Sequence, residues 1–449
     1  MIYLNGINPK TGEYLVPPVE PGDLLEVITG QDDGEQSGLR GYLHRKTAVA
    51  GLPVGINEND PAEAGWGVIF SENESPEIAN AFQPLIEHRK THIPQTRVKS
   101  FTHRAGQSFN KWLAEHGVGA GQVDPEKIPF YLLIVGDPEA IPFSFSQRLG
   151  LEYRVGRLAF DRPCDCTNYI NSLIEFERHG AKERKGGLLV FAPSHDSATQ
   201  LSCDNLAEPL AHKLANRTPV DCLLREKATK VDLLHRLRAG SPLLIFSASH
   251  GLGLELADED QARWQGAIVC QREREGGPLT ADDFFSAADV TDEIDFTGTT
   301  AFFFACFSAA TPSHDRFFRR KGLPRPLAQR GFFSALPRRL LSKPGGAALA
   351  VLGHIDRAWG SSILNERANP LRTPFENALL RSLDGIPSGQ ALKDFYDRYA
   401  SYSIELTDLI DTQELGGNVD QKELILAWAR RNDAGGYVLL GDPAARITG

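Results

Sequence analysis

The sequence has no long hydrophobic run, few cysteines and no excess of positive charge. No stretch approaches the roughly 18 consecutive apolar residues of a membrane-spanning helix, so we expect no membrane partner. Six cysteines in 449 residues are too few for a disulfide scaffold. The formal net charge of −10 argues against a nucleic-acid partner. The N-terminus lacks the pattern of a signal peptide, and we therefore expect a cytoplasmic protein.

Motifs for bound cofactors are also missing. Neither Gly-x-Gly-x-x-Gly nor Gly-x4-Gly-Lys-Ser/Thr follows a predicted strand, which argues against a nucleotide-binding protein. The pair Cys164-Asp-Cys166 lacks the usual spacing of zinc ligands. We therefore expect neither a cofactor nor a metal. What the sequence does have is 41% hydrophobic and 24% charged residues, enough for a globular protein with a proper core.

Short apolar runs alternate with helical patterns, which predicts an α/β fold with a doubly wound, mainly parallel sheet. A strand–helix–strand–helix–strand series begins at Trp66, and the same order repeats from Gly187. This repetition predicts two related subdomains behind an irregular N-terminal segment. The predicted divisions are residues 1–60 for the irregular segment, 61–165 for a degenerate subdomain and 166–449 for the subdomain that carries the chemistry.

Two apolar runs of the second subdomain end at residues that can perform chemistry. Residues 241–249 lead to His250, and residues 300–305 lead to Cys306. The carboxyl ends of parallel strands line the ligand crevice of an open sheet, so neighbouring strands would bring His250 and Cys306 together. Such a pair is a cysteine nucleophile with its base. The matching strand of the first subdomain ends at residues 135–137 in Val-Gly-Asp, without a catalytic residue.

These elements resemble the caspase-like cysteine peptidases. Ser-His-Gly at 249–251 is similar to their His-Gly element, and Ala-Cys-Phe-Ser at 305–308 to their Cys element. The 56-residue separation of the two is close to the roughly 50 residues of caspases. Tyr131–Pro138 and Tyr437–Pro443 resemble gingipain-type peptidases, in which a degenerate subdomain precedes the active one, and CHAT-type bacterial caspase-like proteases fit equally well.

The resemblance implies a cysteine endopeptidase that acylates Cys306 and hydrolyses protein substrates, with His250 as base or as proton donor to the leaving amine. The CHAT-type likeness implies an effector in bacterial defence or cell death. The backbone N–H groups of Gly251 and Cys306 are the expected oxyanion donors, since a glycine lets a carbonyl group approach closely. The residue that orients the imidazole stays open among three carboxylates: Glu152, Asp165 and Asp196.

Specificity is expected to depend on carboxylates near the dyad. Asp196 follows the first strand of the catalytic subdomain and could pair with Arg or Lys, so we expect cleavage after a basic residue. Its alternative role is to cap the following helix. His354, Asp356 and Trp359 follow a later strand at the same edge and are expected to shape the substrate cleft. His354 and His314 are the alternative bases.

After the Cys element comes a cationic loop, residues 316–330. One interpretation is a solvated loop. The other is self-cleavage after Arg319, Arg320 or Lys321, because caspases are processed in the loop after their Cys strand. A rival to the enzyme is a non-enzymatic caspase-like scaffold that recruits a partner through residues 1–60 and the degenerate half. A regulatory protein partner also fits the enzyme. Thiol labelling distinguishes the enzyme from the scaffold, because an activated Cys306 should react faster than the other five cysteines.

Overall fold

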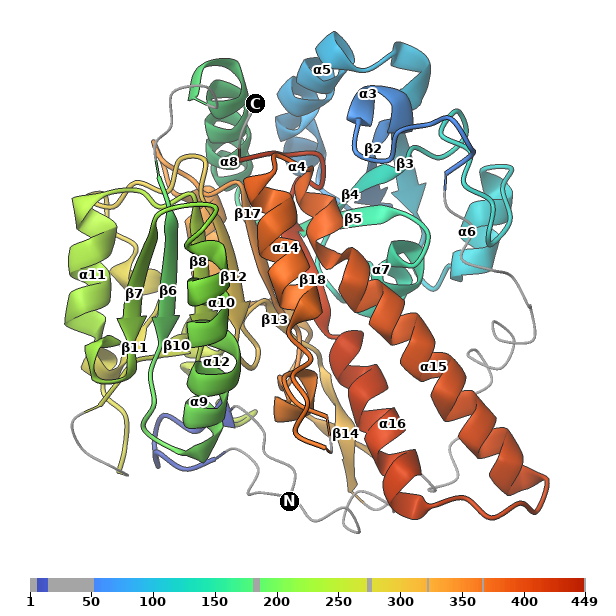
Figure 1. The fold of residues 1–449 in the computed structure, drawn as a ribbon. Helices are drawn as coiled ribbons and strands as arrows, with labels where there is room; N and C mark the ends of the chain where they lie inside the picture. Colours follow the sequence, from blue (N-terminus) through green and yellow to red (C-terminus); the bar gives the residue numbers. More distant parts are fainter. Residues whose placement is uncertain are drawn as a thin grey trace.

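The computed structural model describes residues 6–14, 52–180, 186–272, 277–320, 323–365 and 367–447. Its centre is a ten-stranded sheet with helices on both faces (Figure 1). The strand order is β3-β2-β4-β5-β18-β17-β12-β8-β6-β7. Strands β17 and β18 pair in antiparallel fashion, and the other pairs of this sheet are parallel. The predicted α/β class with a mainly parallel sheet is confirmed.

The first part of the chain forms one end of the sheet and the second part forms the other. The first part contributes β2 (Trp66–Ser71), β3 (Val98–His103), β4 (Tyr131–Val135) and β5 (Arg154–Leu158). The second contributes β6 (Leu188–Ala192), β7 (Val220–Leu224), β8 (Leu244–Ala248), β12 (Thr300–Phe304), β17 (Ala350–His354) and β18 (Tyr437–Gly441). In each part the first strand lies between the second and the third.

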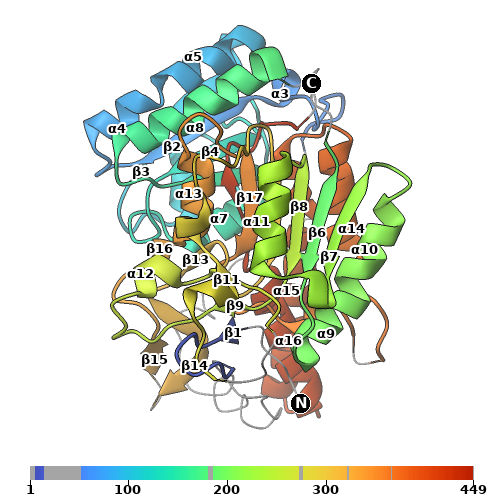
Figure 2. The ribbon, with the colours of Figure 1, turned by 90° about the vertical axis from the view of Figure 1, so that its left-hand side faces the viewer.

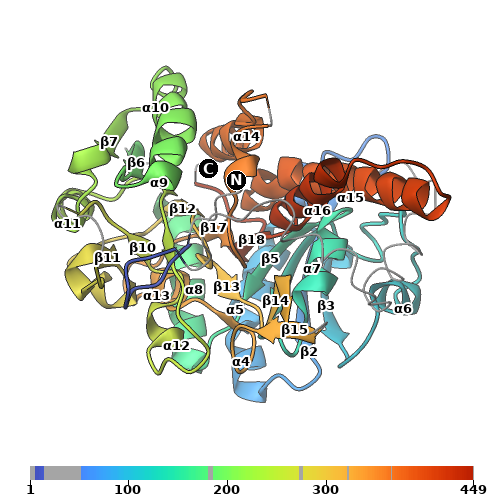
Figure 3. The ribbon, with the colours of Figure 1, turned by 90° about the horizontal axis from the view of Figure 1, so that it is seen from below.

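Helices cover both faces of the sheet because the crossover connections of each part run in opposite directions along it. Connections that run in opposite directions place their helices on opposite faces. Helices α10 (Glu208–Leu214), α14 (Thr373–Leu383) and α15 (Lys393–Glu414) lie on one face, and α8 (Pro163–Glu175), α11 (Lys230–Ala239) and α13 (Ala335–Ser342) on the other (Figure 3). The remaining α-helices are α3 (Pro61–Ala64), α4 (Pro76–Ala81), α5 (Gln83–His92), α6 (Phe109–Glu115), α7 (Phe143–Gly150), α9 (Ser197–Ser202), α12 (Gln261–Trp264) and α16 (Gln421–Ala434). The described helices are all too short or too polar to cross a bilayer.

Smaller sheets lie beyond the carboxyl ends of the central strands. The largest joins β1 (Gly6–Ile7), β9 (Gly251–Leu252), β10 (Ile268–Val269) and β11 (Phe284–Phe285) in that order (Figure 2). A two-stranded sheet joins β13 (Ala310–Thr311) to β16 (Phe332–Phe333). The N-terminal strand β1 thus lies beside β9, which directly follows His250 in the chain.

The prediction of a cationic loop over residues 316–330 is wrong for most of its length. The strands β14 (His314–Arg320) and β15 (Leu323–Pro326) pair there in a hairpin. Phe317 anchors the hairpin, because its buried ring packs 4.7 Å from the ring of Trp359 and 5.3 Å from that of Trp428 in α16. Lys321 lies outside the described residues, as does most of the predicted segment 1–60.

A buried ionic network ties α5 of the first part to the end of β18. The Asp442 carboxylate is fully buried and accepts from the Trp66 indole at 2.9 Å and from Arg89 Nη2 at 2.8 Å. The Arg89 guanidinium also donates to Glu177 at 2.8 Å. Each charge in this network therefore has a partner, as burial of charged groups requires.

Removing one partner should leave an uncompensated buried charge. We expect Asp442→Ala to lower the free energy of unfolding by about 3–5 kcal/mol. Asp161→Ala is the matched control, because Asp161 is exposed and pairs with Arg338 at the surface, and its loss should cost about 1 kcal/mol or less. Urea unfolding followed by circular dichroism measures both. Equal losses would contradict the importance of the buried network.

Candidate active site

The candidate site lies where two paired strands end. Strands β8 and β12 pair in parallel, and their last pair joins Ala248 to Phe304. Two residues beyond these positions the chain reaches His250 and Cys306, which we call the dyad. The Ser249 N–H donates to the Phe304 carbonyl at 3.1 Å, so the two backbones stay in contact past the strand ends. The strand register thus places both dyad residues at matching positions of neighbouring strands.

Gly251 packs directly against the backbone of Cys306. A methyl group at position 251 would lie 1.8 Å from the Cys306 carbonyl oxygen and 2.9 Å from the Cys306 nitrogen. No side chain fits in that space, because contacts below 3.0 Å between heavy atoms of this kind do not occur. The two residues expected to supply oxyanion donors therefore lie in direct backbone contact.

Asp196 holds the imidazole of His250. The Nε2 atom of His250 lies 2.7 Å from Asp196 Oδ2, and the other carboxylate oxygen accepts from the Thr199 N–H at 2.9 Å. Burial pushes the Asp196 pKa up, but the nearby His250 and the two hydrogen bonds outweigh it and hold the pKa well below its usual value. An ionised carboxylate only accepts, so Nε2 carries the proton and donates. The other nitrogen, Nδ1, is buried without a hydrogen-bond partner in the described structure.

Asp196 is positioned by the local sequence that follows β6. It is the N-cap of α9, in a capping box with Thr199, so its side chain is fixed by the start of the helix. The same carboxylate therefore caps α9 with one oxygen and holds His250 with the other. Of the carboxylates considered for orienting the imidazole, this is the one that the structure places on His250.

Cys306 occupies a sharp turn after β12. The next residue, Phe307, has a φ of 55°, a left-handed conformation that is costly for a residue with a side chain. The Phe307 N–H donates to the Asp356 carbonyl at 2.8 Å, and the Ala358 N–H donates to Cys306 Sγ at 3.3 Å. The turn is thus held by the segment that follows β17, the neighbouring strand.

The N-terminal segment, residues 6–14, lies beside His250, and we call it the cover. Gly6 and Ile7 pair with Gly251 and Leu252, and the Tyr14 ring meets the His250 ring edge-on at 5.4 Å. The cover is closed further by an ion pair between Lys10 and Asp258 at 2.7 Å. Both dyad residues have an exposed fraction of 0%. Burial raises the pKa of the Cys306 thiol far above its usual value, although the Ala358 N–H lowers it, so the thiol is protonated in this state.

Two of the predicted cleft residues are fully buried in structural contacts. Both ring nitrogens of His354 are occupied, one by the Asp433 carbonyl at 3.0 Å and the other by the Asp356 N–H at 3.1 Å. Trp359 has an exposed fraction of 0%, and its backbone N–H donates to the Asp433 carboxylate at 2.9 Å. In this state neither side chain faces an open cleft.

Asp356 belongs to a buried charged cluster beside the turn of Cys306. Arg357 forms a bidentate pair with Asp315, at 3.0 and 2.8 Å, and donates to Asp356 Oδ1 at 3.3 Å. The second oxygen of Asp356, Oδ2, is buried and has no hydrogen-bond partner within the described ranges. Burial raises the Asp356 pKa, with Arg357 opposing the rise. The Arg357 guanidinium therefore pairs with two buried carboxyl groups at once.

The other site residues predicted from the sequence lie outside the dyad and its contacts. Asp165 pairs with Arg162 at the start of α8, and Glu152 is buried in the first part of the chain. His314 is exposed, with its ring on Ser313 Oγ at 3.2 Å. Arg319 and Arg320 pair with residues of β15, next to the turn of the β14–β15 hairpin.

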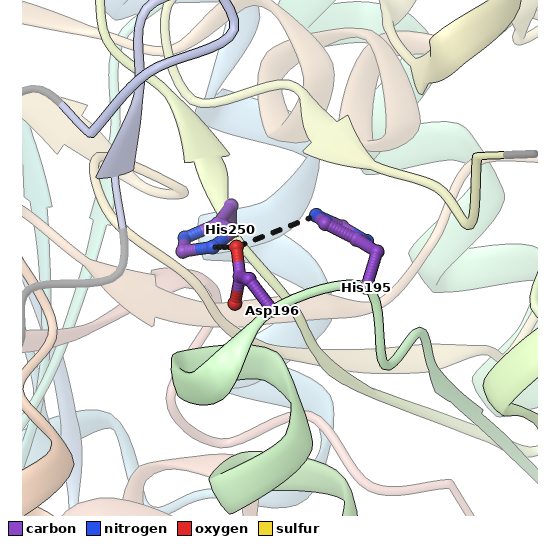
Figure 4. A group of neighbouring side chains, drawn as sticks. All are labelled: His195, Asp196 and His250. Atoms are coloured by element: carbon purple, nitrogen blue, oxygen red, sulfur yellow. Dashed lines mark hydrogen bonds and ion pairs between the residues drawn. The ribbon is translucent and has the colours of Figure 1, made fainter. Parts of the chain in front are cut away.

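Sequence reasoning missed two residues at the dyad, His195 and Tyr14. The His195 ring lies 5.7 Å from the His250 ring, and its Nε2 lies 3.7 Å from Asp196 Oδ2 (Figure 4). Burial lowers the His195 pKa to about 4, with His250 adding to the effect. A signal for His195 was present, since it precedes Asp196 just past a predicted strand. Nothing in the local sequence connects Tyr14 to a site more than 230 residues away.

The chain is thus an α/β protein with a Cys-His pair at the carboxyl edge of its sheet. No family model and no curated protein matches its sequence. Solved structures match it. The Arg-specific cysteine proteinase gingipain R is 12% identical, with a TM-score of 0.46 over 88% of this chain and 79% of that one. The complex of the pro- and mature domains of RgpB from Porphyromonas gingivalis is 12% identical, with a TM-score of 0.45 over 85% and 79% of the respective chains.

The Saccharomyces cerevisiae separase–securin complex is a more distant neighbour, 12% identical with a TM-score of 0.32 over 71% of this chain and 16% of that one. Gingipain R is a clan CD cysteine protease and separase is a caspase-like protease.

The contact between Gly251 and Cys306 predicts that even the smallest side chain at 251 is harmful. We expect Gly251→Ala to lower the free energy of unfolding by about 1–3 kcal/mol, because the strand ends must move apart. The control is Gly240→Ala, since a methyl group there meets no heavy atom within 4 Å. Urea denaturation measures the free energy of unfolding of both variants. A loss of stability at position 251 no larger than that at position 240 would refute the close contact.

The covered dyad predicts slow alkylation of Cys306. We expect iodoacetamide to label the exposed Cys164 and Cys222 first, and Cys306 at least about tenfold more slowly, since each unit of raised pKa removes nine-tenths of the thiolate. Mass spectrometry of tryptic peptides gives the rate at each cysteine. This expectation reverses the one drawn from the sequence for an activated, open site.

Loosening the cover should speed that labelling. Tyr14→Ala with Lys10→Glu removes the ring contact with His250 and turns the ion pair with Asp258 into a repulsion, so two contacts of the cover are lost. We expect Cys306 to react about tenfold faster and Cys164 at an unchanged rate. Lys90→Glu, at a surface pair with Glu87, is the matched control. Unchanged labelling of Cys306 would show that residues 6–14 do not limit access.

Proposed function

We propose that the chain is a cysteine endopeptidase that hydrolyses protein substrates through Cys306 and His250. One observation carries the proposal: paired strands present a cysteine and a histidine at matching positions, with the histidine held by a carboxylate. This is the general arrangement of a nucleophile, its base and the group that orients the base.

The tautomer of His250 fits this chemistry. With Nε2–H donated to Asp196, the lone pair lies on Nδ1, the nitrogen without a hydrogen-bond partner among the described residues. In the open enzyme Nδ1 takes the thiol proton of Cys306, and the thiolate attacks the scissile carbonyl carbon. The imidazolium, stabilised by Asp196, then returns the proton to the leaving amine, and water hydrolyses the acyl-enzyme. The N–H groups of Gly251 and Cys306 are the proposed donors to the oxyanion.

Cleavage after Arg or Lys is the proposed specificity, with Asp356 in place of Asp196 as the recognising carboxylate. Asp196 is engaged by His250 and Thr199, whereas Asp356 has an unpartnered oxygen. Its backbone carbonyl also binds the residue after Cys306, so Asp356 lies close to the reacting thiol. A guanidinium or ammonium group of a substrate would satisfy that oxygen by a charge-assisted bond.

A scaffold without activity is the second candidate, and the complete burial of the dyad favours it. Under the enzymatic proposal, the same burial describes a closed state that a protein partner opens. A role as an effector in bacterial defence or cell death, and self-cleavage after Arg319, Arg320 or Lys321, stay predictions from the sequence resemblance.

Peptide hydrolysis tests the proposal. We expect fluorogenic peptides with Arg or Lys before the scissile bond to be cleaved by the Tyr14→Ala/Lys10→Glu variant, and by the wild type more slowly. Cys306→Ala in the same background should abolish cleavage. Asp356→Asn should lower kcat/KM for Arg peptides by about 10- to 100-fold, the effect of losing a hydrogen bond to a charged group.

His314→Asn is the control for the substitution at 356, because this exposed histidine lies outside the proposed machinery. Cleavage that survives Cys306→Ala would refute the nucleophile. Cleavage after Asp or Glu instead of Arg would refute the role of Asp356. Absence of cleavage, with Cys306 shown to be accessible by alkylation, would favour the scaffold.

A further inference from the structure

Three potential metal ligands converge beside the dyad. His195, Asp196 and His250 each offer one ligand atom, and these atoms all lie within 4.8 Å of one another. Figure 4 shows the imidazole rings on either side of the Asp196 carboxylate, with both dashed lines ending at the same oxygen, Oδ2. His250 Nε2 lies 2.7 Å and His195 Nε2 lies 3.7 Å from Asp196 Oδ2. The cluster comes from two separate loops, which follow β6 and β8.

The spacing suits a tetrahedral ion. With metal–ligand bonds of about 2.0–2.1 Å, neighbouring ligand atoms of a tetrahedral site lie about 3.3 Å apart. His250 Nε2 is closer to Asp196 Oδ2 than this spacing and His195 Nε2 is farther from it. All three ligand atoms lie within 4.8 Å of one another, so side-chain rotation has to bring them to the tetrahedral spacing. Two imidazoles with one carboxylate suit zinc and similar transition metals, whereas calcium and magnesium prefer oxygen ligands.

His195 supplies an independent sign of a missing ligand. Its side chain is nine-tenths buried, and within the described residues neither ring nitrogen has a hydrogen-bond partner. Burying a polar group without a partner is costly, so an unpaired buried imidazole calls for an explanation. The proposed peptidase chemistry needs His250 and Asp196 but gives His195 no task. A metal ion bound between His195 and Asp196 would give it a partner.

We propose that His195, Asp196 and His250 form an inhibitory site for a zinc ion. Inhibition follows from the tautomer and rests on the proposed function. An ion on Nε2 displaces the proton of that nitrogen, so the proton of neutral His250 must lie on Nδ1. The nitrogen that should accept the thiol proton of Cys306 becomes a donor instead. Zinc thus prevents His250 from acting as the base without binding to Cys306 Sγ. A water molecule takes the fourth position of the ion.

Calorimetric titration of the full chain with zinc chloride tests the site without relying on activity. The protein is first freed of metal by dialysis against a chelator. We expect one zinc ion per chain, and binding at least about tenfold weaker in His195→Asn. His235→Asn is the matched control, because His235 is an exposed histidine of α11 away from the cluster. His195→Gln serves as a second variant if the asparagine lowers the melting temperature.

Cys306→Ala separates this site from a zinc ion held by the dyad thiol. It should bind zinc as the wild type does, and loss of binding in this variant would overturn the proposal. Equal zinc affinity of the wild type and both His195 variants would also overturn the proposal. The absence of zinc binding by the wild type would overturn it as well.

The activity arm uses the open variant, Tyr14→Ala/Lys10→Glu, with an Arg peptide. Zinc should inhibit cleavage, and His195→Asn in that background should raise the inhibitory concentration by the same factor as the dissociation constant. Zinc binding without any peptidase activity would uphold the site and refute the proposed function. Peptidase activity that zinc leaves unchanged, at concentrations that saturate the site, would refute the inhibition.

Discussion

The parallel pairing of β8 with β12 is the constraint on which the site depends. Parallel strands keep a fixed register, so the residues that follow the last pair, Ala248 and Phe304, leave the sheet side by side. The close contact of Gly251 with the Cys306 backbone continues that register past the strand ends. A slip of one residue would turn every side chain of a strand to the opposite face. The rigid sheet therefore positions the dyad, and the loops around it only refine the arrangement.

Burial and reactivity oppose each other at this site. A thiol reacts as the thiolate, yet a thiol with no contact to solvent keeps its proton. The N-terminal segment that adds a strand beside β9 also packs on His250, and both dyad residues are buried. Under the proposed function, this closed structure holds the protein inactive until the cover opens. That opening is then the step at which a partner would act.

Asp196 links three functions through one side chain. It caps α9, it holds His250, and it lies between two imidazoles that can share a metal ion. Fixing the carboxylate by the helix cap removes the entropic cost of orienting it for each of the other tasks. The buried group around Arg357 differs, because one oxygen of Asp356 bonds to Arg357 and the other has no hydrogen-bond partner among the described residues.

The sequence by itself determined the α/β class and the placement of His250 and Cys306 just past the ends of neighbouring strands. Strand ends are visible in local apolar periodicity, and the pairing rule for parallel strands is general. It left Asp196 as one of three carboxylates, since a loop side chain can turn toward a helix cap, a histidine or a substrate. Only the tertiary structure decided that Asp196 meets His250, that Phe317 anchors a hairpin where a loop was expected, and that Tyr14 covers the dyad. These contacts join residues far apart in the chain, and no local pattern encodes such a distance.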